Sequence, residues 1–229
     1  HAATRALRDY VTKNNFKGVL IGMSGGIDSV LCAAIATDAL GKDKVRCVMM
    51  PSPFTSKDSL EDAAECSKRL GVSYDIIPIA DAMEAFENTI PALNGIAHEN
   101  MQARCRGVIL MTLSNQNGYL VLSTGNKSEL AVGYATLYGD MVGGFAPIKD
   151  IYKTQIYDIA KWRNEQSAVI PERILSKAPT AELKPNQTDQ DSLPPYPILD
   201  GILQCFIERD LGIEETIEEG FDAETVKRV

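Results

Sequence analysis

The 229-residue chain is long enough to bury the core of one large domain, and its 45% hydrophobic and 24% charged residues are typical of a soluble globular protein. Its net charge of −8, without a Lys/Arg-rich run, counts against a nucleic-acid partner, and no apolar stretch approaches the length of a membrane span. The five cysteines are odd in number and lack CxxC spacing, so we expect a reducing, cytoplasmic environment and no zinc site.

Strand and helix patterns alternate as far as about residue 164. Short apolar runs predict strands, and apolar residues at helical spacing predict the helices between them. This alternation predicts an α/β fold, a doubly wound, Rossmann-like parallel sheet with helices on both faces. The predicted strands cover 18–23, 44–50, 72–79, 118–124 and, as a fifth candidate, 143–148; the predicted helices cover 28–40, 56–70 with Gly71 as its stop, 80–89, 97–116 and 150–164.

The composition changes after this alternation. Six of the eleven prolines fall between 171 and 197, and the residues among them are polar and without apolar period. We therefore predict a long irregular loop that is a candidate lid, followed by short helices at 198–210 and 214–229. We assign 2–175 to the main domain and 176–229 to a lid-like loop and C-terminal helices of the same domain.

The turn "MSGGIDS" at 23–29 lies between a predicted strand and a predicted helix. Its glycines, the backbone N–H groups and the helix dipole favour a bound anion, and the hydroxyls of Ser24 and Ser29 add donors. Asp28 would repel phosphate unless a magnesium ion lay between them. The alternative is that Asp28 is a helix N-cap on an ordinary tight turn. The spacing fits neither GxxxxGK[ST] nor GxGxxG.

The segment "SGGIDS" resembles the pyrophosphatase loop of ATP-dependent adenylating enzymes, whose fold is of the adenine nucleotide alpha hydrolase type. "ENMQARCRG" at 99–107, the block at 123–154 and "KAPTAEL" at 177–183 resemble NAD synthetase, and the resemblance covers nearly the whole chain. It is closest to the synthetase portion of glutamine-dependent bacterial enzymes. In that type an amidase domain precedes this portion and a basic segment follows it, so we expect the printed sequence to be part of a longer chain.

The resemblance implies that deamido-NAD is adenylated by ATP and then amidated to NAD, with release of pyrophosphate and AMP. It implies ammonia as the donor for this chain, and glutamine where an amidase domain is present. Another adenylating amidotransferase, or a non-catalytic ATP-binding regulator on the same fold, is the alternative.

The resemblance also implies roles for particular residues. It assigns catalysis to Asp140, placed near the ammonia, and to Lys153 on the ATP phosphates. It assigns Mg²⁺ to Asp28 and Glu129. It assigns the dinucleotide to Asn100, Arg104 and Glu129. It assigns ATP to Gly22, Met23, Ser24, Gly25, Gly26, Ile27, Asp28, Ser29, Thr124, Lys153 and Thr180.

Plainer interpretations of some of these residues remain open. Asn126 and Glu129 have the spacing of a capping box, Lys153 could be a solvated lysine, and Thr124 a turn residue. Arg106 is interpreted as structural or at an interface.

The resemblance further implies a homodimer or a higher homo-oligomer. Val108 and Met111 follow the face of the 97–116 helix that carries Asn100 and Arg104, so this face could present apolar surface to a partner.

Overall fold

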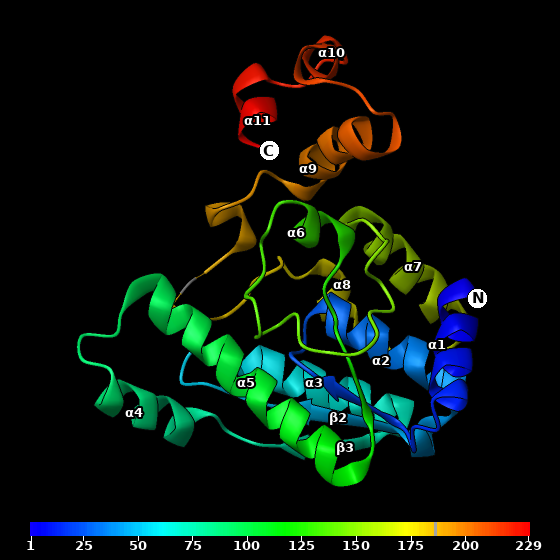
Figure 1. The fold of residues 1–229 in the computed structure, drawn as a ribbon. Coiled ribbons are helices and arrows are strands. Elements are labelled where there is room, and N and C mark those ends of the chain that lie inside the picture. Colours follow the sequence, from blue (N-terminus) through cyan, green and yellow to red (C-terminus); the bar gives the residue numbers. More distant parts are fainter. Residues whose placement is uncertain (186) are drawn as a thin grey trace.

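The structure, a computed structural model, describes residues 1–185 and 187–229. Its centre is a sheet of four parallel strands in the order β3-β2-β1-β4 (Figure 1). Because β2 and β4 lie on opposite sides of β1, the strand order reverses there, as in a doubly wound sheet. The predicted α/β fold is confirmed. The strands are β1 (Val19–Gly22), β2 (Val45–Met49), β3 (Ser73–Ile76) and β4 (Leu120–Leu122).

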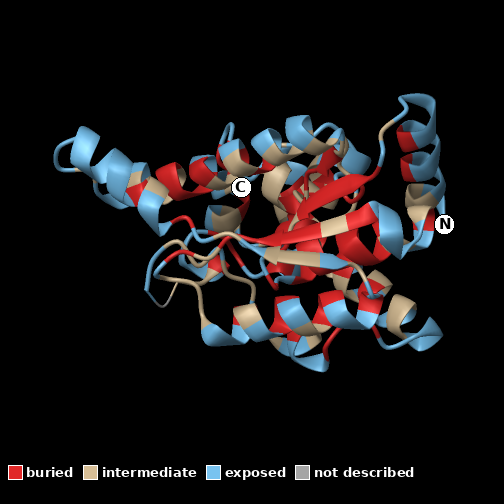
Figure 2. Cartoon of the chain, turned by 90° about the horizontal axis from the view of Figure 1, so that it is seen from below, coloured by how far each residue is buried: buried red, intermediate tan, exposed pale blue. Residues whose placement is uncertain are grey.

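Helices cover both faces of this sheet. Val19 and Ile21 of β1 pack on one face, and Leu20 packs on the other, as the two-residue period of a strand requires. Figure 2 shows the buried strands and the exposed outer sides of the surrounding helices. The first face is covered by α1 (Ala2–Lys13), α2 (Ile27–Leu40), α3 (Lys57–Leu70) and α7 (Lys153–Gln166), and the second by α4 (Ala80–Thr89) and α5 (Gly95–Asn117).

The ends of α3 follow the predicted signals. The Ser56 hydroxyl accepts a hydrogen bond from the Ser59 N–H at 3.1 Å and caps the first turn. Gly71 ends the helix in the left-handed conformation, at φ +69°.

The region between β4 and α7 differs from the prediction. The fifth strand is wrong, because Phe145 forms only an isolated bridge with Leu122. Gly143 approaches β4 so closely that a Cβ would lie 2.5 Å from the Ser123 nitrogen, so only glycine fits there. The predicted helix start at 150 is also wrong, since α7 begins at Lys153 and Asp150 instead pairs with Lys127 at 3.2 Å.

The proline-rich segment is less irregular than predicted. It contains α8 (Glu172–Ser176) and a 3₁₀ turn, η2 (Asp189–Asp191). Arg173 ties α8 to Asp62 of α3 at 2.9 Å. The other short elements are η1 (Lys42–Lys44) and α6 (Lys127–Ala131).

The C-terminal helices also differ in their boundaries. The helix α9 (Tyr196–Leu203) starts two residues earlier than predicted and continues as a π-helical turn, η3 (Gln204–Glu208). The predicted helix at 214–229 is two helices, α10 (Ile213–Glu218) and α11 (Ala223–Arg228), because Gly220 takes φ +100° between them. In Figure 1 these elements stand beyond α6 and α7, away from the sheet. Among the residues that the structure describes, no helix has both the length and the apolar character needed to cross a bilayer.

Candidate active site

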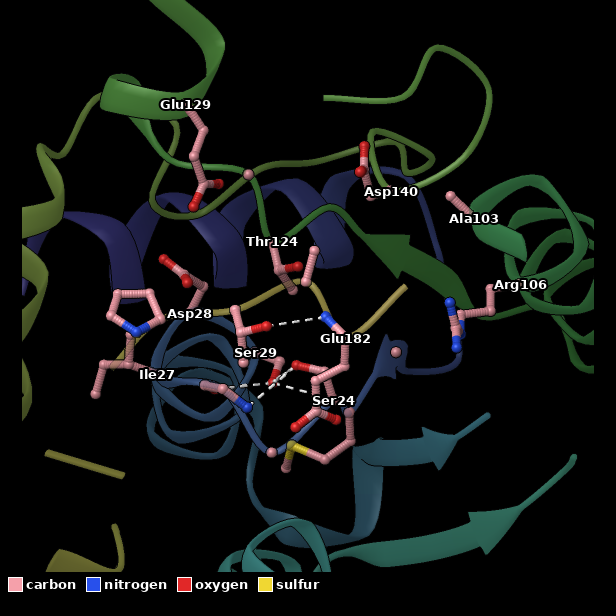
Figure 3. Close-up of a pocket in the computed structure, with 18 of the residues that line it drawn as sticks. Ser24, Ile27, Asp28, Ser29, Ala103, Arg106, Thr124, Glu129, Asp140 and Glu182 are labelled. Carbon is pink, nitrogen blue, oxygen red and sulfur yellow. Dashed lines mark hydrogen bonds between the residues drawn. The ribbon is translucent and has the colours of Figure 1, made fainter. Parts of the chain in front are cut away.

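A cavity of about 290 Å³ lies at the carboxyl ends of β1, β2 and β4 (Figure 3). This is the edge of the sheet at which the strand order reverses, where open parallel sheets bind their ligands. The walls are formed by the turn after β1, the end of β2, the pocket side of α5, residues 134–142 and residues 177–183. All eight predicted residues of the glycine turn, Gly22 to Ser29, line this cavity, as do Thr124, Asp140 and Thr180.

The glycine turn is tightly folded and lines the cavity. Gly25 has φ +83°, and a Cβ there would lie 2.4 Å from the Ser59 carbonyl oxygen, so only glycine fits. The Ser24 N–H donates to the Ser29 hydroxyl at 3.2 Å, and the Gly26 N–H donates to the Ser24 hydroxyl at 3.1 Å. The N-cap of α2 is Gly26, so the alternative interpretation of Asp28 as the N-cap is wrong.

Asp28 instead belongs to a buried cluster around Lys153. The Lys153 ammonium lies 2.5 Å from Asp28 Oδ2 and 2.9 Å from Glu129 Oε1. The Lys153 side chain is 2% exposed, so the interpretation of it as a solvated lysine is wrong. Asn126 Nδ2 donates to Asp28 Oδ1 at 3.0 Å, and the Tyr196 ring lies 5.3 Å from the ammonium. A buried cation is therefore held by two carboxylates from different helices.

These neighbours shift the pKa values within the cluster. Burial by itself would lower the pKa of Lys153, but Asp28 and Glu129 outweigh it and raise that pKa. Burial, followed by the charge of Asp28, raises the pKa of Glu129 even though Lys153 acts in the opposite direction. The two carboxylates thus favour the charged form of the buried lysine between them.

Asn126 and Glu129 form half of the expected capping box. The Asn126 side chain accepts the Glu129 N–H at 3.0 Å and caps α6. The Glu129 carboxylate does not return to the N-cap but turns to Lys153. The backbone of Glu129 therefore takes the capped position while its carboxylate faces the pocket, and its assigned contact with metal or dinucleotide stays a prediction.

The side chains of Asp140 and Thr180 are held by hydrogen bonds with nearby main-chain groups. Asp140 Oδ1 accepts the Thr136 N–H at 2.9 Å. Asp140 is accessible to solvent at the pocket wall, yet the protein atoms around its carboxyl partly desolvate it and raise its pKa. The Thr180 hydroxyl donates to the Gln187 carbonyl at 2.6 Å and accepts the Glu182 N–H at 3.2 Å.

Asn100 and Arg104, the two residues of α5 that the resemblance assigns to the dinucleotide, do not line the cavity. Asn100 Oδ1 accepts the Thr136 hydroxyl at 2.8 Å, and the exposed Arg104 donates from Nε to the Leu137 carbonyl at 3.2 Å. Both therefore support the 134–142 wall from outside. Their contact with substrate stays a prediction.

Sequence reasoning missed Arg106, which faces the cavity together with Ala103 and Leu110. These three residues have the three- and four-residue spacing of one helix face, but the hydrophobic pattern of α5 does not show that this face meets the cavity. Arg106 Nε donates to the Met50 carbonyl at 2.9 Å, and burial lowers the pKa of the guanidinium to about 10. Arg106 therefore lines the pocket, and it also makes a structural hydrogen bond that ties α5 to the end of β2.

Glu182 is a second missed residue, although it lies within "KAPTAEL". Its carboxylate accepts the hydroxyls of Ser56 and Ser59 at 2.7 and 2.8 Å, and the Ser56 N–H at 3.2 Å. Lys177 lies 3.2 Å from the same carboxylate. The carboxylate thereby fastens the 177–183 wall to the N-terminus of α3.

Asp28 and Glu129, both paired with Lys153, are the carboxylates at this site that could hold a metal ion. Among the described residues, no group of three or more His, Cys, Asp or Glu side chains is arranged to hold one. Asp28 and Glu129 supply the oxygen ligands that magnesium prefers, and Mg²⁺ in nucleotide sites commonly takes its other ligands from phosphates and water. The residues therefore fit a magnesium ion that binds together with a nucleotide. Without the nucleotide, Lys153 pairs with both carboxylates.

The chain is similar to several characterised proteins. A glutamine-dependent NAD(+) synthetase from Acinetobacter baylyi is 54% identical over 98% of this chain and 43% of its own length. The solved glutamine-dependent NAD+ synthetase from Acinetobacter baumannii, in complex with ADP, is 49% identical with a TM-score of 0.75 over 99% of this chain and 42% of that one. The NH3-dependent NAD synthetase from Campylobacter jejuni, in complex with nitrate, is 30% identical with a TM-score of 0.81, over 99% of this chain and 87% of that one.

The chain thus spans about two fifths of the length of the glutamine-dependent relatives. Its higher identity to them agrees with the resemblance in the quoted motifs. A family model described as NAD synthase matches residues 1–229, and this chain belongs to that family.

Proposed function

We propose that the protein converts deamido-NAD to NAD at the expense of ATP, by way of an adenylated carboxylate. The observation that carries this proposal is the buried Asp28–Lys153–Glu129 cluster beside the glycine turn. A regulator that only binds ATP would need the glycines but not a desolvated lysine between two carboxylates. The names of the relatives support amidation of the dinucleotide.

The proposed reaction has two steps. In the first, a carboxylate oxygen of deamido-NAD attacks the α-phosphorus of ATP, and pyrophosphate leaves with the bridging oxygen. In the second, the ammonia nitrogen attacks the acyl carbon, and AMP leaves with the former carboxylate oxygen. Asp140 would take the proton that the nitrogen loses. Adenylation is needed because a carboxylate is otherwise inert toward ammonia.

The pocket residues have distinct roles in this scheme. The backbone N–H groups at the start of α2 and the hydroxyls of Ser24 and Ser29 would bind phosphate oxygens, with Thr124 and Thr180 on neighbouring walls. Lys153 would stabilise the charge that develops on the phosphates. Asp28 and Glu129 would hold Mg²⁺, which when bound neutralises phosphate charge.

We also propose a homodimer in the cytoplasm, in which α5 forms part of the interface. Val108 is 66% exposed and Met111 39% exposed, on the side of α5 that the fold leaves uncovered. The division at residue 175 into a main portion and a lid with C-terminal helices stays a prediction.

Product analysis tests the proposed function. Deamido-NAD, ATP, magnesium and ammonium should give NAD, AMP and pyrophosphate in equal amounts. Residues 1–229 should use ammonium and not glutamine, because the resemblance assigns glutamine hydrolysis to a separate amidase domain. Formation of ADP and phosphate, or no NAD from protein with a cooperative thermal transition, would contradict the proposal.

A further inference from the structure

Three cationic side chains line the pocket in the described part of the chain, and they differ in their partners. Lys153 lies between Asp28 and Glu129, and Lys177 lies 3.2 Å from Glu182. Arg106 has no carboxylate within 4.0 Å among the described residues. It is thus the pocket cation that forms no salt bridge, although the Glu182 carboxylate acts on its charge from a longer distance.

Arg106 is nevertheless held in a fixed position. Its Nε donates to the Met50 carbonyl at the end of β2, at 2.9 Å, which orients the guanidinium at the pocket wall. Figure 3 shows the side chain reaching from α5 toward the cavity, on the side opposite Asp28 and Glu129. A largely desolvated guanidinium is costly unless an anion joins it. The guanidinium is therefore positioned to donate hydrogen bonds to an anionic ligand.

The pocket has two separate places for negative charge. One is the glycine turn with Lys153, and the other is Arg106 across the cavity. A ligand that fills this space needs anionic groups set apart from one another, as in a nucleotide that carries several phosphates. The planar guanidinium matches phosphate geometry in a way that a lysine would not.

We infer that Arg106 binds a phosphate group of a nucleotide substrate at the end of the pocket opposite Lys153. This inference rests on the proposed function, which supplies two sources of the phosphate, ATP and the dinucleotide. Arg106 is then a specificity-determining residue, because it distinguishes a phosphorylated ligand from a bare nucleoside.

Calorimetric titration separates the sources. Wild type, Arg106→Met and Arg106→Gln are titrated with a non-hydrolysable ATP analogue plus magnesium, with deamido-NAD, and with adenosine. The control is Arg46→Met, since Arg46 is also partly buried but pairs with Asp75 on the sheet, outside the pocket. Both Arg106 variants should bind one of the phosphorylated ligands about tenfold to a hundredfold more weakly, because a hydrogen bond to a charged group is lost. Adenosine binding should not change, and Arg46→Met should bind all ligands as wild type does.

The outcomes are decisive in each case. Unchanged affinity of a folded Arg106 variant for both phosphorylated ligands overturns the inference, and so does an equal loss of adenosine affinity, which would place Arg106 on the base. If Arg106→Met lacks a cooperative thermal transition, the same titrations with the polar, uncharged variant Arg106→Gln test the inference. The wild type could bind both nucleotides and the Arg106 variants bind them more weakly, while the wild type makes no NAD. That result would refute the proposed function but would support the contact of Arg106 with a phosphate.

Discussion

At the scale of single residues, the site depends on one buried cation and its two carboxylates. Asp28 and Glu129 would repel a triphosphate if they stood alone, and Lys153 would be unstable in the pocket without them. The opposite charges of the three side chains thus compensate one another in the pocket. The arrangement lets two carboxylates remain beside the glycine turn, where the proposed function needs them to hold a metal ion.

Asp28→Asn removes one charge from this cluster while keeping the side-chain shape. We expect kcat for adenylation to fall about a hundredfold or more, since a preorganised charge at the reacting phosphates is lost. The measurement is pyrophosphate release. Asp38→Asn is the matched control on the same helix, because Asp38 pairs with Arg163 outside the pocket and should not affect pyrophosphate release. Near-normal release by Asp28→Asn would remove Asp28 from the mechanism.

At the scale of elements, the C-terminal helices help to place Lys153. Asp200 of α9, which is 2% exposed, accepts the Ser128 hydroxyl of α6 at 2.5 Å and the Thr154 N–H of α7 at 2.9 Å. The Ser128 hydroxyl in turn accepts the Lys153 N–H at 2.8 Å. Asp200 therefore clamps the start of α7 to α6, which carries Glu129.

Asp200→Asn should loosen this clamp by replacing one acceptor oxygen with a donor that faces an N–H or a hydroxyl. We expect stability to fall by about 1–3 kcal/mol and kcat to fall while the KM for deamido-NAD changes little. Asp210→Asn, at an exposed position after η3, is the control for stability and kcat. A variant with lowered Tm but wild-type kcat would reduce Asp200 to a purely structural role.

The 177–183 wall is the other element whose attachment can be tested. The Glu182 hydrogen bonds from Ser56 and Ser59 outweigh burial and lower the pKa of Glu182 below 4.5. A lowered carboxyl pKa contributes stability that is present above 4.5 and is lost as the pH falls through the folded-state pKa. Glu182→Gln should therefore lower Tm at neutral pH, and the difference from wild type should shrink as the pH falls below 4.5. A difference that is independent of pH would contradict this.

The same wall should respond to nucleotide. We expect amide exchange over residues 177–185 to slow when magnesium and a non-hydrolysable ATP analogue bind, while β1 changes little. Glu182→Gln should speed exchange in the free protein. No change at a demonstrably filled site would make the segment a surface linker.

At the scale of the whole molecule, the exposed apolar side of α5 predicts association. Val108→Lys combined with Met111→Lys should shift a dimer toward monomer in light scattering, because each places a charge in the interface. Ile207→Lys, at a 48% exposed apolar residue of η3, is the control. A fully active wild-type monomer would defeat the dimer proposal.

The fold and the site were predictable from the sequence to different degrees. Apolar periodicity located all four strands, and the Ser56 and Gly71 signals located the ends of α3, because these patterns are local. The start of α7 was misplaced, since Asp150 has the side chain of an N-cap but pairs with Lys127 instead.

The contacts within the site follow from the tertiary fold and not from local pattern. Lys153 meets Asp28 across 125 residues of sequence, so its burial has no local signal. The choice between Arg104 and Arg106 depended on the rotation of α5 about its axis, which the hydrophobic pattern of this helix does not fix.

The formation of an adenylated carboxylate is the central claim, and an isotope label tests it most directly. Deamido-NAD labelled with ¹⁸O in its pyridine carboxylate is incubated with the protein, ATP, magnesium and ammonium, and the AMP is analysed by mass spectrometry. Because AMP leaves with the oxygen that attacked the α-phosphorus, each AMP should carry one ¹⁸O for every NAD formed. NAD formed alongside unlabelled AMP, or with the label in inorganic phosphate, would contradict the account.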